Sequence, residues 1–491
     1  MKRILGTETE FGIASKNTES IDPVSNSIFL INSYPYFPSS STIWDYENEN
    51  PLLDARGFEA DGERERPGPE YNRLLNKLLA NGGRLYVDGA HPEYSTPECT
   101  NAKDLVAYEK AGERILELCV EMANRLKGGE TRFSIYKNNT DGKGNSYGYH
   151  ENYLVSRAVP FEKIVAQLTP FWVTRQIYAG AGKVGSENKT ESAPYQISQR
   201  ADFFEVWVDL NTMVKRPIIN TRDEPHADPA RFRRLHVIVG DANMSEYTTY
   251  LKVGTAALVL EMIEEGREVH GVELENPVRA IKEVSRDLTL KEKIKLLRGA
   301  EWSAVEIQRA YLEQAEAHFS GSRDPVTVDL LGKWREVLDR LEEDPMQLSG
   351  RIDWVIKKEL IESYIRRKEC DWNDPRVSMM DLQYHDVIQS KGLYYALERG
   401  GYVERVVSPE TLVKAQSEPP SDTRAFFRGT CLKKFSKEIY AASWSSVLFD
   451  MGNNTVKKVP LLDPFKGTEA LVGSLLQEAG TVEQLLAILS T

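Results

Sequence analysis

The sequence predicts an α+β fold, because strand-like patterns fill its first half and helical patterns its second half, without the regular alternation of a doubly wound sheet. Alternating apolar and polar residues recur up to residue 240, whereas apolar residues at spacings of three and four dominate from Thr249 onward. The chain has 491 residues, of which 41% are hydrophobic and 28% charged, so it is long enough for a large globular core.

The first strand is expected over residues 1–14, where apolar residues precede a Thr/Glu alternation. Residues 16–79 form a polar stretch with proline and serine, and an excursion of this length inside a domain is usually disordered or functional. A short apolar strand follows at 83–87. The amphipathic pattern from Leu105 to Leu126 predicts a helix that ends at the glycine pair 128–129.

Further strands are predicted on either side of a glycine-rich turn at 141–144, and helices are predicted from Thr249 onward. The strands are expected at 132–140, 148–157, 196–208, 216–221 and 234–240, and the helices at 249–265, 290–298, 302–319, 325–343 and 350–367.

The segment 415–422, which carries paired prolines and small polar residues, has the composition of a linker. It divides the chain into a large domain, residues 1–414, and a small C-terminal domain, residues 415–491. In the small domain, 440–450 is expected to form a strand that carries Trp444.

Composition excludes several classes of protein. The net charge is −12 and no basic tract interrupts it, which argues against nucleic acid as a partner. Glu8 and Glu10 break the apolar stretch that a secretory signal needs, and the most apolar segment, 256–263, is too short for a membrane span. Four widely spaced cysteines fit neither a disulfide scaffold nor a structural zinc site. We therefore expect a cytoplasmic protein that needs no membrane, whose oligomeric state stays open, a monomer included.

The first candidate for chemistry is the pair Glu8 and Glu10. Because the two residues are two apart in a strand, their side chains leave the same face about 7 Å from one another. Such a pair is often only the solvated face of a sheet. The alternative is ligation of a divalent cation, because Mg²⁺ prefers carboxylate oxygens and commonly bridges to nucleotide phosphates.

The second candidate is the run 84–94, Arg-Leu-Tyr-Val-Asp-Gly-Ala-His-Pro-Glu-Tyr. Period-two geometry places Arg84, Tyr86 and Asp88 on one face of the predicted strand. An aspartate at the strand end, with Glu93 five residues later, suits a nucleophile or base beside a metal-bound carboxylate. An edge strand with an ordinary acidic turn would explain the same residues.

The third candidate is the strand after the glycine-rich turn, where His150 and Asn152 share a face. Both side chains can bind a metal ion or a nucleotide, although a lone histidine is more often a structural hydrogen-bonding group. The same two interpretations hold for His226 and His236. No P-loop, dinucleotide fingerprint, serine-hydrolase elbow or zinc-protease motif occurs in the sequence.

Several segments resemble those of one known family. The matching segments are 6–12 (Gly-Thr-Glu-Thr-Glu-Phe-Gly), 84–94, 136–139 (Tyr-Lys-Asn-Asn) with 150–152 (His-Glu-Asn), 220–228, 233–243, 423–429 and 441–444. In this order they are similar to the family of Pup ligases and Pup deamidases/depupylases. The resemblance implies a glutamine synthetase-like large domain, with a curved, mainly antiparallel sheet packed by helices, and a small C-terminal domain.

The polar stretch at about 37–80 resembles the long insertion of the depupylase branch of this family. The residues at 241–243, Asp-Ala-Asn, and the sequence at 142–147 also resemble that branch. Gly89 departs from it, since a bulkier residue is expected there after the aspartate. The resemblance therefore implies an ATP- and Mg²⁺-dependent hydrolase that deamidates the C-terminal glutamine of Pup and cleaves the isopeptide bond between Pup and a lysine. Its partners would be Pup and pupylated proteins.

The resemblance also implies roles for individual residues. Asp88 matches the catalytic aspartate, acting either as nucleophile or as base. The other implied roles are metal binding by Glu8, Glu10, Tyr86, Glu93, His150 and His236, nucleotide binding by Arg84, Thr96, Asn152 and Trp444, and binding of a substrate carboxylate or phosphate by Arg200 and Arg222.

Three alternatives stay open at this point. The first is a Pup ligase, in which ATP would phosphorylate the glutamate carboxylate and Asp88 would deprotonate the incoming lysine. The second is a non-catalytic Pup-binding or ATP-sensing protein on the same fold. The third is a ligase of small carboxylates and amines.

Overall fold

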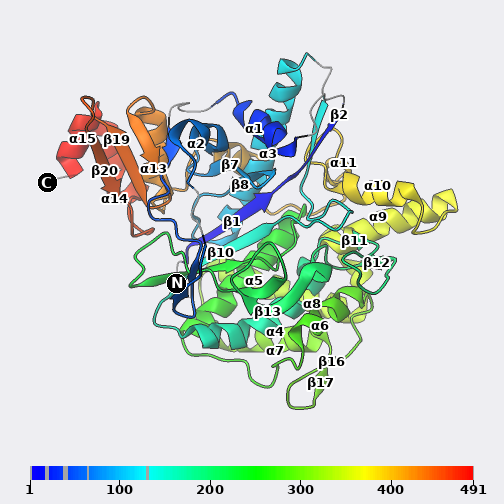
Figure 1. Ribbon diagram of the computed structural model, residues 1–491. Helices are drawn as coiled ribbons and strands as arrows, with labels where there is room; N and C mark the ends of the chain where they lie inside the picture. Colours follow the sequence, from blue (N-terminus) through cyan, green and yellow to red (C-terminus); the bar gives the residue numbers. More distant parts are fainter. Residues whose placement is uncertain (1–2, 17–21, 37–41, 63–65, 129–131, 490–491) are drawn as a thin grey trace.

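A six-stranded sheet lies at the centre of the computed structural model, which describes residues 3–16, 22–36, 42–62, 66–128 and 132–489 (Figure 1). Every pair of neighbouring strands in it is antiparallel. In spatial order the strands are β15 (Phe232–Val237), β10 (Tyr149–Ser156), β1 (Leu5–Glu10), β8 (His91–Ser95), β7 (Arg84–Asp88) and β6 (Asn76–Leu78). The predicted α+β fold with a mainly antiparallel sheet is confirmed.

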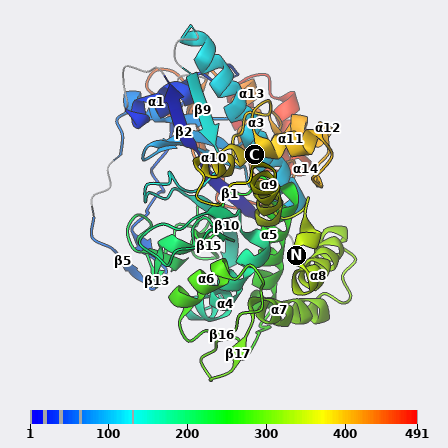
Figure 2. The same ribbon diagram turned by 90° about the vertical axis from the view of Figure 1, so that its right-hand side faces the viewer.

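The sheet separates an apolar layer from a polar face. In β1, Leu5, Thr7 and Thr9 are buried, whereas Glu8 and Glu10 on the alternate face are half-buried. Helices cover the buried face (Figures 1 and 2). They are α1 (Pro23–Asn32), α3 (Ala102–Leu126), α4 (Phe161–Ala179) and α5 (Glu246–Glu264). Side chains of α3, α4 and α5 contribute to one large core cluster.

Most predicted helices are confirmed. The helices of the second half are α6 (Pro277–Arg286), α7 (Ala304–His318), α8 (Pro325–Glu343), α9 (Asp353–Lys368), α10 (Pro375–Tyr384), α11 (Leu393–Arg399) and α12 (Pro409–Ala415). The prediction of a helix at 290–298 is wrong. Leu290 has a φ of 60°, and β16 (Ile294–Lys295) forms a hairpin with β17 (Glu301–Trp302), so the buried Ile294 and Leu296 follow a period of two.

Several helices, α4 and α6 among them, are absent from the predicted elements. In α4 nearly every side chain is buried and Pro170 lies inside the helix, so neither an amphipathic stripe nor a clean boundary marks it. The apolar segment 256–263 lies within α5 and is buried, as expected. Among the described residues, none of the helices has the length and apolar character needed to cross a membrane.

Several predicted strands are shorter or divided. The expected strand at 1–14 is split at Phe11 into β1 and β2 (Gly12–Lys16), and residues 1–2 lie outside the described residues. A 3₁₀ turn, Ala201–Phe203, interrupts the expected strand at 196–208. The remaining strands of this region are β9 (Arg132–Tyr136), which pairs with β2, β11 (Lys183–Val184), which pairs with β12 (Tyr195–Gln196), and β13 (Phe204–Asp209), which runs parallel to β14 (Arg216–Asn220).

The C-terminal elements form a second, four-stranded sheet beside the first (Figure 1). The expected strand at 440–450 is a hairpin with Trp444 in its turn. The elements are β18 (Ile439–Ala442), β19 (Ser446–Asp450), β20 (Val456–Pro460), α13 (Ala425–Lys434), α14 (Glu469–Glu478) and α15 (Val482–Leu489). The domain boundary after residue 414 stays a prediction.

The predicted insertion at 37–80 contributes to both sheets. Its strand β3 (Ile43–Trp44) pairs with β18, and β6 is the edge of the central sheet. Between them lie β4 (Leu53–Asp54), β5 (Phe58–Glu59) and α2 (Pro69–Leu75), while residues 37–41 and 63–65 lie outside the described residues.

Candidate active site

The strand register brings the predicted site residues together on the polar face of the central sheet. Directly opposite Cα positions point their side chains to the same face. Glu8 lies opposite both His150 and Ser95, while Glu10 lies opposite Glu93. The same alignment pairs Tyr86 with Glu93 and Asn152 with His236.

A two-residue turn places Asp88 at the end of β7. Asp88 is opposite His91, so only Gly89 and Ala90 connect β7 to β8. Gly89 has a φ of 54°, the left-handed conformation that such a hairpin turn requires and that glycine adopts without steric cost. The turn geometry accounts for the glycine that departs from the family pattern.

The polar face is the floor of a cavity of about 890 Å³. Eleven of the thirteen predicted site residues line it, namely Glu8, Glu10, Arg84, Tyr86, Asp88, Glu93, His150, Arg200, Arg222, His236 and Trp444. The other two, Thr96 and Asn152, line a smaller adjoining cavity of about 80 Å³, which shares Glu8, Arg234 and Trp444 with the large one. The structure thus gathers all thirteen residues around two connected spaces.

Glu8, His150 and His236 form what we call the histidine group, and one ligand atom from each lies within 4.8 Å of the others. Glu8 Oε2 is 3.3 Å from His150 Nδ1, and Glu8 Oε1 accepts a hydrogen bond of 3.1 Å from Asn152. Burial alone would raise the pKa of Glu8, but the His150 contact and the charges of His236 and Arg234 hold it well below its usual value. The Nε2 atom of the buried His236 has no hydrogen-bond partner among the described residues.

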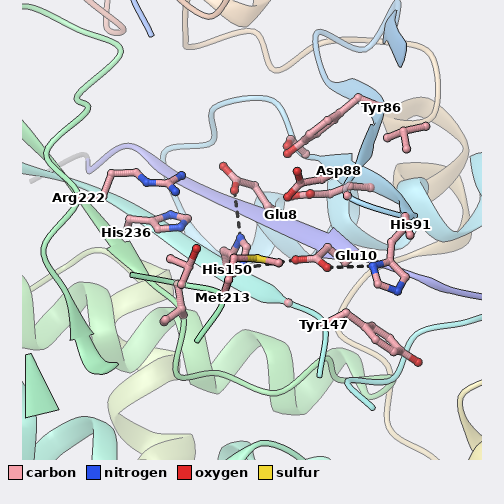
Figure 3. Close-up of a pocket in the computed structure, with 18 of the residues that line it drawn as sticks. Glu8, Glu10, Tyr86, Asp88, His91, Tyr147, His150, Met213, Arg222 and His236 are labelled. Atoms are coloured by element: carbon pink, nitrogen blue, oxygen red, sulfur yellow. Dashed lines mark hydrogen bonds and ion pairs between the residues drawn. The ribbon is translucent and has the colours of Figure 1, made fainter. Parts of the chain in front are cut away.

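Glu10, Asp88 and Glu93 form what we call the carboxylate group, with ligand atoms again within 4.8 Å of one another. Figure 3 shows Asp88 near Glu8 and Glu10. Glu93 is buried, and neither of its carboxylate oxygens has a hydrogen-bond partner in the described chain. Desolvation, followed by repulsion from Asp88 and Glu10, raises the pKa of Glu93 well above its usual value. Loss of bulk water and repulsion from Glu10 also raise the pKa of Asp88.

Among the described residues, Glu10 is the member of the carboxylate group that pairs with histidines, His91 and His150. His91 Nδ1 lies 3.3 Å from Glu10 Oε2, and the His91 ring packs on Tyr147 with 4.6 Å between ring centroids. Burial raises the pKa of Glu10, but the hydrogen bond from His91, electrostatic attraction to His150 and His91 and a backbone hydrogen bond from Gly148 together outweigh it, and the net shift is downward.

Arginines surround the acidic floor. Arg200 is buried, and within the described ranges neither it nor the cavity-lining Arg216 forms an ion pair with a carboxylate. Desolvation, followed by repulsion from Arg216, lowers the pKa of Arg200 to about 10. Arg222 lies beside His236, across the cavity from His91 and Tyr147 (Figure 3). These arginines give the cavity positive charge suited to an anionic ligand.

The insertion forms part of the wall. The Arg84 guanidinium carbon lies 3.9 Å from the ring centroids of both Trp44 and Tyr86, an arrangement typical of cation–π contacts. Trp44 also packs edge-on against Trp444, with ring centroids 5.2 Å apart. Glu49 from the same segment lines the cavity.

Some cavity residues are missing from the predicted set. Arg234 could have been found, because it lies two residues before His236 on one strand, and its Nη1 atom donates a 2.8 Å hydrogen bond to Asn152. Arg216, Tyr147 and Glu49 reach the cavity from other elements, and no local pattern in the sequence marks them.

Carboxylates and imidazoles in two groups on an antiparallel sheet, ringed by arginines, define an enzyme-type site equipped for divalent cations and anionic ligands. The chain belongs to the Pup-ligase protein family, whose model matches residues 3–448.

Similar proteins include both branches of that family. A depupylase of Acidothermus cellulolyticus is 49% identical, with 100% of this chain and 99% of the relative covered. A Pup deamidase/depupylase of Mycolicibacterium smegmatis is 44% identical, with 99% of each chain covered. A Pup–protein ligase of Acidimicrobium ferrooxidans is 45% identical, but only 83% of this chain and 90% of the relative are covered.

Solved structures of the ligase PafA share the fold. The complex between the prokaryotic ubiquitin-like protein Pup and its ligase PafA matches with a TM-score of 0.80 at 32% identity, covering 100% of this chain and 94% of the other. PafA in complex with ADP matches with a TM-score of 0.75 at 35% identity, covering 85% and 97%.

Proposed function

We propose that this protein is a Pup deamidase/depupylase, an enzyme that hydrolyses the side-chain amide of a C-terminal glutamine of Pup and the isopeptide bond between Pup and a lysine. The observation that carries the proposal is the 49% identity to a depupylase along the full length of both chains. The cavity supports it, because one site suffices for two reactions that attack the same γ-carboxamide carbon. Its partners would be Pup and pupylated proteins, in the cytoplasm.

Asp88 is the proposed catalytic residue. It ends β7, faces the cavity and has no ion-pair partner among the described residues, so its carboxylate is available to a substrate. It would either attack the amide carbon itself or take a proton from an attacking water. In each case the carbon–nitrogen bond breaks, and ammonia or the lysine amine leaves after gaining a proton. If Asp88 attacks, an anhydride with its carboxylate remains and a water molecule then hydrolyses it; if Asp88 acts as a base, the water adds directly and the glutamate carboxylate is the product.

The carboxylate group fits Mg²⁺ better than the histidine group. Hard cations prefer carboxylate oxygens, and neither carboxylate oxygen of Glu93 has a hydrogen-bond partner within the described residues. Glu10 and Glu93 would hold such an ion, with Tyr86 and the histidine group completing the metal-binding face. When bound, the cation would stabilise the negative charge that develops on the amide oxygen.

The nucleotide is proposed to lie against Arg84, Thr96, Asn152 and Trp444, where the small cavity meets the large one. The ADP complex of PafA supports nucleotide binding by this fold. Hydrolysis of an amide needs no ATP turnover, so ATP is proposed as a bound cofactor. A fixed ratio of one ATP consumed per bond cleaved would contradict that role.

Arg200 and Arg222 are proposed to hold a substrate carboxylate or a phosphate. Arg200 is a buried cation with an unpartnered Nε atom, and Arg222 also has an unpartnered Nε atom. Buried guanidinium groups without a carboxylate are costly, and a planar anionic ligand would satisfy them.

Intact-mass analysis tests the function directly. Pup ending in glutamine, and separately a Pup–protein conjugate, are incubated with the protein, Mg²⁺ and ATP. Conversion of the glutamine to glutamate together with release of free Pup is expected, and both should disappear with Asp88→Asn. If neither substrate changes, the proposed function is wrong.

The second candidate is a Pup–protein ligase, because ligases of the family are 45% identical and both solved structures are of the ligase PafA. The same experiment separates the two. A ligase would attach Pup ending in glutamate to protein lysines and leave the glutamine form unchanged.

A further inference from the structure

The segment 241–243, Asp-Ala-Asn, lies behind the cavity and is fully buried. It follows β15 and lines neither of the two cavities, so its side chains do not contact a ligand there. Its polar atoms are nevertheless joined to two segments that do line the large cavity.

The first joined segment carries Arg200. The Asp241 carboxylate accepts three hydrogen bonds of 2.8 Å each, from Ala181 N, from Ser198 Oγ and from Gln199 N. Ser198 Oγ in turn accepts a hydrogen bond of 3.0 Å from Arg200 N. One buried carboxylate therefore fixes the backbone immediately before Arg200.

The second joined segment carries Tyr147. Asn139 Oδ1 accepts a 2.7 Å hydrogen bond from Ala242 N, and Asn139 Nδ2 donates one of 3.1 Å to Tyr147 O. Gln199 links the two segments directly, since its Oε1 atom accepts a 2.8 Å hydrogen bond from Asn139 N. Both walls of the cavity are thus anchored to one buried network.

Arg200 depends on this anchoring more than an ordinary arginine would. It is 2% exposed, its Nε atom has no partner in the described chain, and its Nη1 atom donates to Ile238 O. No carboxylate within the described ranges holds the guanidinium by an ion pair. Its direction is therefore set by the backbone that carries it, together with the Ile238 carbonyl and the Phe204 ring, whose centroid lies 5.5 Å from the guanidinium carbon.

We propose that Asp241 is a positioning residue, which holds Arg200 in the place where it binds the anionic group of the Pup substrate. This inference rests on the proposed function, since that function supplies the substrate. Asp241 itself touches no reacting atom. It follows that loss of Asp241 should weaken Pup binding and leave nucleotide binding unchanged, because Arg84, Trp444 and the small cavity have no bond to it.

Asp241→Asn tests the proposal, since three donors converge on the carboxylate and an amide has only one acceptor oxygen. The KM and Kd for Pup ending in glutamine are measured with the full-length protein, together with the Kd for ADP. Both Pup constants should rise about tenfold, the factor expected for loss of one charge-assisted hydrogen bond, with the ADP constant unchanged within about twofold. Parallel loss of ADP binding would overturn the proposal, because it would indicate a general structural defect.

A double-mutant cycle with Arg200→Gln provides the second readout. If Asp241 acts through Arg200, adding Asp241→Asn to Arg200→Gln should change Pup binding less than about twofold. Independent, additive losses would contradict the inference. Since the Kd for Pup is measured without turnover, an inactive but Pup-binding protein would contradict the proposed function and still decide the role of Asp241.

Two further variants control for stability. Glu246→Gln is the matched control, because Glu246 is a buried carboxylate that accepts from Val406 N and Val407 N at 2.7 and 2.9 Å and lines no cavity wall. It should leave both ligand constants unchanged. If Asp241→Asn fails to fold, Ser198→Ala removes only the hydroxyl that links Asp241 to the backbone N–H groups of Arg200 and Ala201, and it should weaken Pup binding in the same selective way.

Discussion

The histidine group and the carboxylate group lie side by side on one sheet face, yet their charges are balanced in opposite ways. Glu8 in the histidine group is contacted by His150, Asn152 and Arg234, and its pKa is lowered. Glu93 in the carboxylate group has no partner in the described chain, and its pKa is raised. Two neighbouring strand positions therefore place chemically identical side chains in opposite electrostatic states.

The difference shows that the protein itself stabilises the buried carboxylate of the histidine group but not that of the carboxylate group. Burying a carboxylate is costly unless hydrogen bonds or positive charges compensate for the lost water. The histidine group receives that compensation from β10 and β15. Glu93 is instead repelled by Asp88 and Glu10, and the neighbouring Tyr86 and Arg84 on β7 do not offset this repulsion and the loss of water. An external cation would relieve the carboxylate group far more than the histidine group.

Asp88→Asn should produce the largest change. It removes the most exposed carboxylate of its group, and loss of a general base or nucleophile commonly costs about 10³-fold in rate. We expect this loss in kcat for deamidation and for isopeptide cleavage alike. ADP binding, measured by calorimetry, should stay intact, and retained cleavage would remove Asp88 from the mechanism.

The sequence alone predicted the residues of both groups, but not that the pKa of Glu8 is lowered while that of Glu93 is raised. Period-two alternation puts Glu8 and Glu10 on one face, and that follows from local geometry. The neighbours of each glutamate depend on the strand order β15-β10-β1-β8-β7-β6, which joins residues more than 200 positions apart. No such pattern predicts that Arg216 lines the cavity, because Arg216 reaches it from a separate two-stranded sheet.

Acid should reveal how strongly a fully compensated carboxylate stabilises the fold. Glu98, away from the large cavity, contacts Arg424 at 2.6 Å and Arg428 at 2.5 Å, and although burial opposes them, these cations lower its pKa to about 2. Because the unfolded value is about 4.3, the carboxylate contributes about 3 kcal/mol above that pH, and this stability is lost as the pH falls toward 2.

Urea unfolding of the protein and of Glu98→Gln measures that contribution. The difference in unfolding free energy between them should be largest above pH 5 and shrink toward pH 2. A constant difference across this range would mean that the ion pairs with α13 contribute nothing as charges.

Magnesium dependence should separate the two groups. If the carboxylate group holds the ion, Glu93→Gln should raise the Mg²⁺ concentration for half-maximal activity about tenfold, and Glu8→Gln less than about threefold, since imidazole suits Mg²⁺ poorly. Activity is titrated with Mg²⁺ at saturating ATP and Pup. Equal shifts in the two variants would show that both groups share the ion.

The smallest expected effect is also the most direct test of the contrast, because its sign differs between the groups. In metal-free buffer at pH 7, Glu93→Gln should raise the free energy of unfolding by about 1 kcal/mol, since it removes a buried carboxyl group whose ionisation the folded state opposes. Glu8→Gln should lower it by about 1 kcal/mol, because it weakens contacts with His150 and Arg234. Both are measured by urea unfolding in the presence of a chelator.

The pH dependence of the Glu93→Gln effect fixes its cause. A raised pKa in the folded state means that the fold binds the proton more tightly than the unfolded chain, so the wild-type protein loses stability as the pH rises above about 4.3. The stabilisation by Glu93→Gln should therefore vanish near pH 4 and grow toward pH 7, and excess Mg²⁺ should reverse its sign. A gain that is independent of both pH and Mg²⁺ would come from side-chain packing, and the two groups would then not differ in charge balance.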